Sequence, residues 1–462
     1  MSTNDMSNWT NHGVIDVKAI APWISRAWAP SIISREESDG LHFYMYFTNG
    51  GGSIGVLTST SPVGPWTDPL GKALIDGSTQ GIGTISSIID PGAAINPSTG
   101  EAYLAFGGGD IQSEGSALYP GNARIVKLAD DLISFNSSDI AVISAPCHFE
   151  ANELNFIGKQ WVYSYCTRWT IASNWSDYSS KTAPSSCSII WLMSDNPLAD
   201  SWTYGGEMLP NPGHLGYPFG NNHSHMQQFG SQYYMFYHTQ WLEDKNGYAG
   251  GYRNLQANTI GVKVLRNKPY INGLDASTAA ITGVSQLTGV RVNPYAEQQA
   301  ETMNNGAGVF VEATTTPGNT LVNMPKNAWT SVYGVNCSLG EGKAKSVILN
   351  ASGTGTIEVR KEQDGEAIAT IEISSNDFEE VVCELTEELT GIINNIYFVC
   401  TNGNVKFDSW RFSSETTGVR EVNNGQWSNV KGQLSDGKYI ENGKIIIIRK
   451  SKKYSASGAN LY

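Results

Sequence analysis

The stretch KQWVYSYCT (159–167) decides the fold, because aromatic and small residues alternate along it. Such alternation is typical of a β-strand that lies between two packed layers. Three further stretches have the same pattern, and each follows a glycine turn or a polar loop: LHFYMYFTNG (41–50), EAYLAFGGG (101–109) and QYYMFYHTQ (232–240). The repetition predicts four similar sheets, each with one of these stretches as an inner strand.

A second element accompanies these stretches. The segments NWTNHGVI (8–15), GPWTDPLGKALI (64–75) and DSWTYGGEML (200–209) each carry Trp-Thr ahead of an apolar end. We expect each to form the outermost strand of a sheet, with the indole covering the edge. Repeated strand-rich units of this length predict a β-propeller. The segment 8–15 precedes the first inner strand, so we expect it to close an earlier, truncated blade; the alternative is a four-bladed protein with an N-terminal extension.

The composition agrees with an all-β chain. Among 462 residues, 49 are glycine, 10% are aromatic and only 16% are charged. A net charge of −13 argues against nucleic acid and anionic membranes as partners and fits a neutral polymer.

The six cysteines contain no C-x-x-C pair, which argues against zinc and predicts free, buried thiols. No signal peptide opens the sequence, so we expect either an intracellular protein or one whose N-terminus has been removed.

Several linked motifs, in a fixed order, indicate a family. They are AWAPSII (27–33), GGSIGVLTSTSPVGPW (51–66), SSIIDPGAAINPSTGEAYLAFGG (86–108), APCHFEANELNFIGKQWVYSYCTRW (145–169), GNNHSHMQQFGSQYYMFYHTQ (220–240) and GYRN (251–254). Together they resemble glycoside hydrolase family 43, in particular its arabinoxylan arabinofuranohydrolase and exo-arabinan-cleaving members. The resemblance implies a five-bladed propeller over residues 1–290, with an active site in the central cavity. It also implies hydrolysis with inversion, which needs two carboxyl groups roughly 6.5–9.5 Å apart.

The resemblance implies roles for two carboxyl groups. Glu150, in HFEAN, matches the general acid, which needs a pKa raised toward neutrality by desolvation and a nearby negative charge. Glu153 is the alternative acid if the alignment slips by three residues, and Glu150 would then only cap a turn. Asp90, in IIDPGAAI, matches the third carboxylate of the family, which orients the acid and raises its pKa.

Other residues match the lining of the family's pocket. His223, in GNNHSHM, matches the histidine at the bottom of the cavity, where many members hold a calcium or sodium ion; His225 is a weaker candidate. Arg253, in GYRN, could bind sugar hydroxyls or position a carboxylate. Trp28 and Trp169 could stack on a sugar, although buried core positions would explain them equally well.

By the resemblance, we expect the family's general base to lie outside this sequence. By resemblance it belongs to an Asp-Pro motif in the first blade, upstream of the NWT segment. Loss of a general base typically reduces the rate 10²–10⁴-fold. Asp5 or Asp16 could substitute, a second copy of the chain in a homodimer could cover the gap, or the protein could bind its polymer without cleaving it.

The repeated strand pattern of the propeller region ends near residue 290, and a different run of short strands begins. Short strands between AEQQAETMNNGAGVFVE (296–312) and GNVKFDSWRF (403–412) resemble a family 6 carbohydrate-binding module, a β-sandwich that we place at 291–414. The resemblance implies a structural calcium held by Glu301 and Asp408. Gln299 stands where the family often has another acidic residue. Trp329 matches an aromatic near the module's ligand cleft, but a core position is an equal alternative.

Residues 415–462 form a further small unit. Its segment GKYIENGKIIIIRKSKKY (437–454) resembles C-terminal sorting tails of a bacterial secretion route, which implies a secreted or cell-surface protein; an added hairpin is the alternative.

The whole sequence therefore predicts an arabinose-releasing glycosidase that acts on arabinoxylan or arabinan. The alternatives are a non-catalytic polysaccharide-binding protein and a β-xylosidase or endo-arabinanase of the same family.

Overall fold

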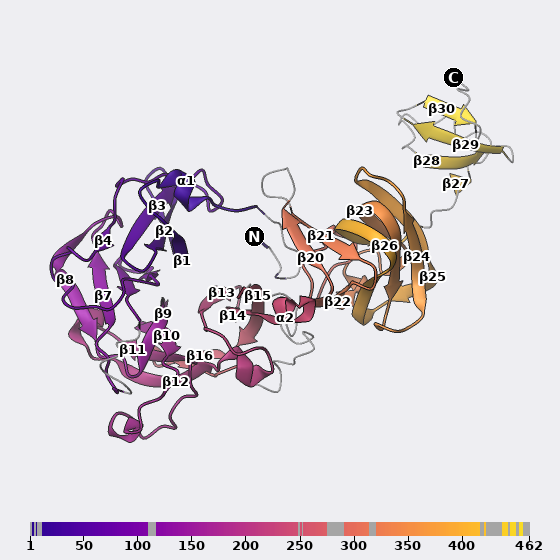
Figure 1. Ribbon diagram of the computed structural model, residues 1–462. Helices are drawn as coiled ribbons and strands as arrows, with labels where there is room; N and C mark the ends of the chain where they lie inside the picture. The colour runs from indigo at the N-terminus through magenta and orange to yellow at the C-terminus, as the bar shows by residue number, and fades with distance from the viewer. Residues whose placement is uncertain are drawn as a thin grey trace.

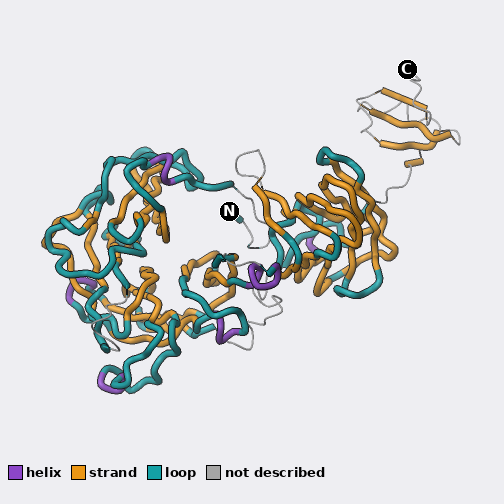
Figure 2. The backbone as a smooth tube through the Cα atoms, in the orientation of Figure 1, coloured by secondary structure: helices purple, strands orange, loops and turns teal. Residues whose placement is uncertain are grey.

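The protein is described here by a computed structural model, and strands dominate it (Figure 1, Figure 2). The structure describes residues 2–3, 6, 12–109, 117–247, 250–251, 253–274, 291–313 and 320–415, and the backbone of four short strands between 420 and 455. The α-helices within these residues are α1 (Val17–Ile20) and α2 (Trp241–Asn246), and no described helix is long and apolar enough to cross a membrane. The expected all-β class is confirmed.

Four antiparallel sheets make up a propeller-like arrangement, and each sheet is one blade. From the first strand outward they are β1 (Ala27–Glu37), β2 (Gly40–Asn49), β3 (Ser53–Ser59) and β4 (Ile75–Asp76); β5 (Gly92–Ile95), β6 (Ala102–Phe106), β7 (Ala123–Leu128) and β8 (Phe135–Ile143); β9 (His148–Ile157), β10 (Gln160–Thr167), β11 (Ile189–Ser194) and β12 (Thr203–Leu209); and β13 (Ser224–Phe229), β14 (Gln232–Thr239) and β15 (Asn254–Ile260). A hairpin of β16 (Val262–Leu265) and β17 (Lys268–Ile271) follows.

The first strand of each blade faces the centre of the arrangement. Strand β1 packs against β5, β5 against β9, and β9 against β13, so the four blades follow one another along an arc (Figure 1). Strands β1 and β13 lie at the two ends of this arc. Of the side chains expected in the cavity, those of Glu150 and Trp28 are carried by first strands, and Asp90 and His223 lie just before first strands; Arg253 and Trp169 lie further out along their blades.

The four aromatic stretches are strands. They correspond to β2, β6, β10 and β14, each the second strand of its blade, so each is an inner strand with a hydrogen-bonded neighbour on both sides. The large rings of Tyr46, Phe106 and Tyr163 on these strands are buried.

The first strands come into close contact at a glycine. A Cβ atom on Gly92 of β5 would lie 2.5 Å from Glu153 Cα and 2.6 Å from the Asn152 carbonyl oxygen, both on β9. Real Cβ contacts are not this short, so only glycine lets the second and third blades approach this closely. Because β9 carries Glu150, this contact also helps to set the position of the candidate acid.

The Trp-Thr segments lie at blade edges where they are described. Thr67 bridges Thr58 of β3, ahead of β4, and Trp66 is buried. Thr203 begins β12, the outermost strand of its blade. In the segment 8–15, residues 8–11 lie outside the described residues, and residues 12–15 form no strand.

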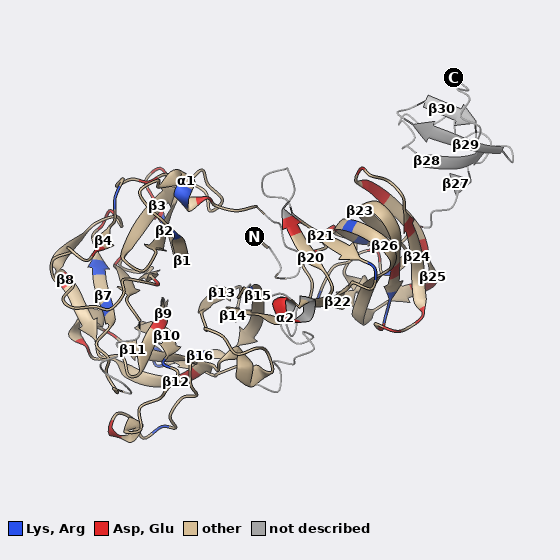
Figure 3. Cartoon of the chain, in the orientation of Figure 1, with Lys and Arg blue, Asp and Glu red and all other residues tan. Residues whose placement is uncertain are grey.

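The second domain is a β-sandwich. Its strands are β18 (Gln298–Gln299), β19 (Asn305–Ala307), β20 (Phe310–Ala313), β21 (Thr320–Pro325), β22 (Trp329–Asn336), β23 (Lys343–Arg360), β24 (Ala367–Ile373), β25 (Glu379–Thr390) and β26 (Ile392–Ser413). The long strands β23 and β26 pair with each other and with strands on both sides. Phe398, Phe407, Trp410 and Phe412 form its aromatic core. β25 carries several glutamates, and red segments of the ribbon in Figure 3 mark acidic positions in the sandwich.

The propeller and the sandwich touch at α2. The Trp241 indole Nε1 donates a hydrogen bond to Asn305 Oδ1 of β19 at 2.8 Å, and Trp241 is buried.

Beyond the sandwich, β27 (Arg420–Glu421), β28 (Gly437–Glu441), β29 (Lys444–Arg449) and β30 (Lys452–Ser455) form a small sheet. The remainder of the predicted sorting tail lies outside the described residues.

Candidate active site

Strand β9 carries the motif HFEAN, and the strand is bulged there. Glu153 lies opposite Ser164 of β10, whereas Glu150 lies opposite Cys166, so that β9 contains one extra residue between these pairs. Ala151, within this bulge, has a left-handed φ of 62°. A bulge turns a side chain away from the regular alternation and is frequent beside active sites. It therefore allows Glu150 to be aimed separately from the rest of β9.

Glu150 has the electrostatics of a carboxylic acid that is protonated near neutral pH. The side chain is half-buried. Burial, and then the negative charge of Asp90, raise the pKa of Glu150 to about 7, although the positive charge of Arg253 opposes the shift. Desolvation and a neighbouring carboxylate are the two causes that the sequence led us to expect. At neutral pH a large fraction of Glu150 can therefore donate a proton.

Asp90 is buried and connects β2, β5 and β9. Its backbone N–H donates to Thr48 Oγ1 at 2.8 Å, and its Oδ2 accepts a hydrogen bond from the Ala151 N–H at 2.7 Å. Asp90 itself has a left-handed φ of 52°. The carboxylate thus holds the backbone directly after Glu150, and its charge acts on the Glu150 side chain.

A buried polar network supports the bulge from behind. Asn152 Nδ2 donates to the carbonyl oxygens of Asp90 (3.0 Å) and Gly107 (2.7 Å), and its Oδ1 lies 2.9 Å from His148 Nε2. The Tyr163 hydroxyl also donates to Asn152 Oδ1 at 2.5 Å. Burial lowers the pKa of His148 to about 4, so this imidazole is neutral at the pH of interest. The network fixes the residues on both sides of Glu150.

The fourth blade supplies the basic side of the site. Arg253 lies just before β15, and its charge acts on both Glu150 and His238 of β14. Burial, followed by the charges of Arg253 and His223, lowers the pKa of His238 to about 4. His223 is half-buried and lies just before β13. The charges of Arg253 and His223 therefore both act on His238, and the charge of Arg253 acts on Glu150 as well.

Glu153 has a different partner from Glu150. Its Oε1 lies 2.7 Å from His225 Nδ1, and the Glu153 side chain is buried. Burial alone would lower the pKa of His225, but the charge and hydrogen bond of Glu153 outweigh it and raise the pKa. This ion pair joins β9 to β13. It gives Glu153 a structural contact and leaves Glu150 as the carboxyl group beside Asp90.

Comparison with known proteins places this chain in a family. The family model "Glycosyl hydrolases family 43" matches residues 1–262, and "Carbohydrate binding module (family 6)" matches residues 299–414. The chain belongs to glycosyl hydrolase family 43. It is 33% identical over 443 residues to an arabinoxylan arabinofuranohydrolase of Bacillus subtilis (strain 168), with 89% of this chain and 82% of that protein covered.

Two further relatives agree. An arabinoxylan arabinofuranohydrolase of Paenibacillus polymyxa is 32% identical over 448 residues, which cover 90% of this chain and 67% of that protein. A crystal structure of a family 43 arabinoxylan arabinofuranohydrolase from Bacillus subtilis, in complex with cellotetraose, superposes with a TM-score of 0.70 at 30% identity. It covers 89% of this chain and 86% of that chain. The resemblance seen in the sequence is therefore confirmed, and this family 43 chain is a glycosidase.

Two tryptophans expected to contact sugar are open to solvent. Trp28, on β1, is 43% exposed, and Trp169, just after β10, is 48% exposed. Large exposed indoles are unlike the buried core positions that were the alternative. Trp329, in the sandwich, is half-buried, and its ring packs against Tyr397 at a centroid distance of 5.6 Å.

The segments expected to hold calcium in the sandwich lie side by side. Gln299 pairs with Ser409, and the Ala300 N–H donates to the Asp408 carbonyl oxygen at 2.8 Å, which places Glu301 near Asp408. Asp408 Oδ2 accepts a hydrogen bond from Asn350 at 2.7 Å. Burial and the nearby charge of Glu297 raise the pKa of Asp408. A cation would offset the negative charge of Glu297 beside Asp408, and carboxylate oxygens are ligands that calcium accepts.

The two substitute bases have different outcomes. Asp16 is exposed at the N-cap of α1, where its Oδ1 accepts a hydrogen bond from the Ala19 N–H at 3.1 Å. This contact accounts for Asp16 as a helix cap. Asp5 lies outside the described residues.

Sequence reasoning missed three residues that the structure places at the site. His148 and Asn152 flank Glu150 within HFEAN, and a histidine and an asparagine so close to a candidate acid were a usable signal. His238 lies in the aromatic stretch 232–240, where the strand pattern concealed it. No local pattern marks it, because its proximity to Arg253 depends on the pairing of β14 with β15.

Proposed function

We propose that this protein releases α-L-arabinofuranosyl side chains from arabinoxylan, with Glu150 as the general acid. The observation that carries the proposal is the raised pKa of Glu150, about 7, caused by burial and by Asp90. Family membership and two relatives named arabinoxylan arabinofuranohydrolase support the reaction and the polymer. Arabinan is the alternative polymer.

The residues have distinct parts in the proposed reaction. Glu150 protonates the glycosidic oxygen as the bond to the arabinose breaks. Asp90 holds the Ala151 N–H and keeps Glu150 protonated until the substrate binds. Arg253 lies where it can bind sugar hydroxyls or stabilise the ionised Glu150 after proton transfer. Trp28 and Trp169 offer exposed ring faces for the polymer.

We also propose the inverting course and a ring of five blades. Supporting this, the four described blades occupy an arc, with β1 and β13 at its ends (Figure 1). A fifth sheet between them would close the ring and would bring the base to the face of the sugar opposite Glu150. The configuration of the arabinose first released, read by NMR spectroscopy within minutes of mixing, tests inversion directly.

Arabinose release from arabinoxylan and from debranched arabinan, measured side by side, tests the function. We expect release by the unmodified chain, a loss of at least 100-fold in Glu150→Gln, and unchanged release in Glu36→Gln, a matched change at an exposed position of β1. Binding to arabinoxylan without release would favour the polysaccharide-binding alternative. Full activity from a monomer, established by light scattering, would exclude a base supplied by a second copy.

We propose that the sandwich binds calcium through Glu301 and Asp408, and that a cation also binds near His223 in the propeller. The negative charge of Glu297 near Asp408 supports the first site. We expect calcium to raise the melting temperature of the sandwich and a chelator to lower it. Asp408→Asn should abolish the calcium-dependent shift, whereas the exposed Asp364→Asn should retain it.

Because the proposed substrate is a polymer too large to enter a cell, we further propose that the protein is secreted or displayed on the cell surface.

A further inference from the structure

Two cysteines that lie 21 residues apart in sequence meet behind the candidate acid. Cys166 is near the end of β10, and Cys187 lies just before β11. The ladder between these strands continues past β11, since the Thr167 N–H donates to the Ser188 carbonyl (2.8 Å) and the Cys187 N–H to the Arg168 carbonyl (3.0 Å). This register puts both side chains on one face, and their Sγ atoms are 3.5 Å apart.

The pair is buried and fixed from several sides. Neither cysteine has exposed surface, at 0% each. Cys166 lies directly opposite Glu150 in the pairing of β10 with β9. The side chains of Asn211 and Asn222 donate to the Cys187 carbonyl oxygen at 3.2 and 3.3 Å. The pair therefore lies between the strand that carries Glu150 and the segment that leads to His223.

All of these thiols have backbone contacts. Cys147, Cys383 and Cys400 have a backbone group as hydrogen-bonding partner at 3.4, 3.4 and 3.2 Å respectively, and Cys166 and Cys187 contact the carbonyl oxygens of Thr167 and Gly220 at 3.4 and 3.8 Å. All six cysteines are free, and Cys383 is the half-exposed one. Cys166 and Cys187 thus differ from these three in that each has a second thiol as a neighbour. This difference gives a built-in internal control for reactivity.

The two thiols are also electrostatically unequal. The hydrogen bond from Cys166 lowers the pKa of Cys187, and further hydrogen bonds from Asn211 and the Asn222 backbone assist it against burial and the negative charge of Glu150. Burial, followed by the interaction with Cys187, raises the pKa of Cys166. The thiolate is the reactive form of cysteine, so the inequality favours Cys187 as the first thiol to react. The 3.5 Å contact between the two sulfurs makes Cys166 the thiol that can resolve its oxidised form.

We propose that Cys166 and Cys187 form a redox-active dithiol behind Glu150, which hydrogen peroxide converts to a disulfide. The Cys187 thiolate attacks one peroxide oxygen; an S–O bond forms, the O–O bond breaks, and the hydroxide that leaves takes up a proton to become water. The Cys166 sulfur then attacks the Cys187 sulfur. The S–S bond forms, the S–O bond breaks, and hydroxide leaves with the Cys166 proton as a second water.

The electron balance is closed by the peroxide. The two thiols lose two electrons and the peroxide gains them, giving two waters. A disulfide has an S–S length of about 2.05 Å, so the sulfurs must approach each other by only about 1.5 Å. The bond would close the loop that carries Trp169 and tie the end of β10 to the start of β11. An oxidising environment outside the cell would favour this form.

Peptide mapping of the full chain tests the proposal. The reduced protein is treated with a small excess of hydrogen peroxide, unfolded, alkylated and digested. We expect a peptide in which Cys166 and Cys187 are linked, with the mass of two hydrogens lost, while Cys147, Cys337 and Cys400 remain alkylated. Dithiothreitol should restore both thiols and reverse a rise of a few degrees in the melting temperature. Two alkylated thiols at 166 and 187 after treatment, or oxidation confined to Cys383, would overturn the proposal.

Variants separate the pair from a general sensitivity to oxidation. Cys166→Ser should leave Cys187 without its resolving thiol, so that treatment yields Cys187 sulfinic acid and no cross-link. Cys383→Ser should form the cross-link as the unmodified chain does. The readout is the mass of a peptide and needs no substrate, so it is independent of the proposed glycosidase activity. A cross-link that forms equally in unfolded protein would show that the folded geometry is not its cause.

Discussion

At the scale of single residues, the site depends on one carboxyl group that another keeps protonated. Asp90 accepts the Ala151 N–H at 2.7 Å and places a negative charge near Glu150. The same contact therefore sets both the position and the protonation of the candidate acid. Arg253 acts in the opposite direction, so the pKa of Glu150 reflects a balance between two charged neighbours.

Asp90→Asn should shift the pH dependence of arabinose release. Glu150 must be protonated, so activity is expected below its pKa of about 7 and is lost as pH rises through it. Asparagine still accepts the Ala151 N–H but removes the charge, so the pKa of Glu150 falls and the alkaline limb moves to lower pH. We expect kcat at pH 7 to fall about 10–100-fold. A lower kcat with an unmoved limb would mean that Asp90 acts by geometry alone.

Glu150→Gln should stabilise the folded protein in a pH-dependent way. The folded pKa of Glu150, about 7, is above the ordinary value of 4.5, so the folded state binds more protons between these values, and stability falls as pH rises through this window. Glutamine removes this penalty. We expect a gain on the order of 2 kcal/mol above pH 7 and none below pH 4. Melting curves at pH 4 and pH 8 measure it, and an equal effect at both would contradict it.

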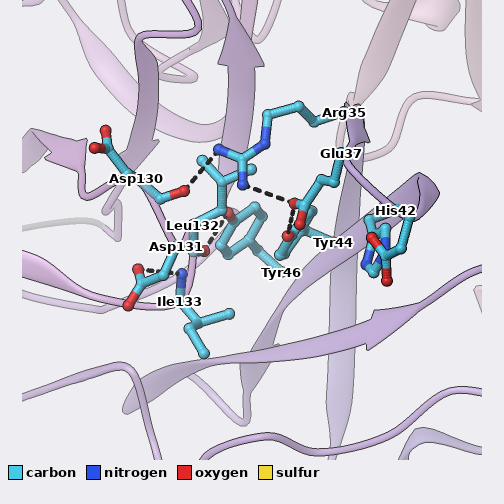
Figure 4. A network of polar contacts seen from close by, with 10 residues as sticks. Arg35, Glu37, His42, Tyr44, Tyr46, Asp130, Asp131, Leu132 and Ile133 are labelled. Atoms are coloured by element: carbon cyan, nitrogen blue, oxygen red, sulfur yellow. Dashed lines mark hydrogen bonds and ion pairs between the residues drawn. The ribbon is translucent and has the colours of Figure 1, made fainter.

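At the scale of elements, contacts between blades are specific as well as hydrophobic. Figure 4 shows one such contact between the first and second blades. Arg35 on β1 donates to the Asp130 carbonyl oxygen at 2.7 Å and to Glu37 Oε1 at 2.7 Å, while Tyr44 also donates to Glu37. The Tyr46 hydroxyl reaches across to the Leu132 carbonyl oxygen at 2.7 Å. These bonds connect β1 and β2 to the turn between β7 and β8.

Tyr46→Phe should loosen this contact without changing the shape of the side chain. Tyr46 is fully buried, so the variant removes a buried hydrogen bond and costs about 1 kcal/mol. For a domain of this size, we expect the melting temperature of the propeller to fall by about 2–4 °C in calorimetry. Tyr270→Phe, at an exposed position of β17, is the matched control and should not change it.

Gly92→Ala should affect both stability and catalysis. The new Cβ would lie 2.5 Å from Glu153 Cα, and backbone cannot move aside as a flexible side chain can. Separating β5 from β9 should cost roughly 1–3 kcal/mol and should lower kcat, since β9 carries Glu150. Gly77→Ala is the control, because nothing lies within 4 Å of its Cβ. Equal melting temperatures and rates in the two variants would show that the blades tolerate the separation.

The sequence predicted which segments form strands better than it predicted which segments pack beside them. The stretch 41–50 corresponds to β2 and 159–167 to β10, because alternation along a chain is local information. Glu150 and Asp90 could be proposed from the sequence because each lies in a recognisable motif. The position of these strands within each blade, the bulge at Ala151 and the contact between Cys166 and Cys187 depend on pairing between distant segments. No local pattern contains that information.

At the scale of the whole molecule, the sandwich contacts a propeller segment that also leads to the site. Residues 240–253 run from the end of β14 to Arg253, and α2 lies within them. The Gly251 N–H donates to Glu243 Oε1 at 2.9 Å, which folds this segment back on α2. Trp241 packs edge-on against Tyr217 at 5.7 Å and donates to Asn305 of the sandwich. The sandwich thus contacts the segment that delivers Arg253 to the site.

Asn305→Ala should therefore weaken the contact between the two domains and have a smaller effect on the site. Losing the acceptor of the Trp241 indole should cost about 1 kcal/mol. We expect faster hydrogen–deuterium exchange in α2 and β19 and a rise in KM for the polymer of less than 10-fold, because Arg253 becomes less well placed while Glu150 is unaffected. Asn376→Ala, at an exposed position of the sandwich, should change neither quantity. Faster exchange in β19 alone, with KM unchanged, would mean that the sandwich docks on α2 without influencing how Arg253 is held.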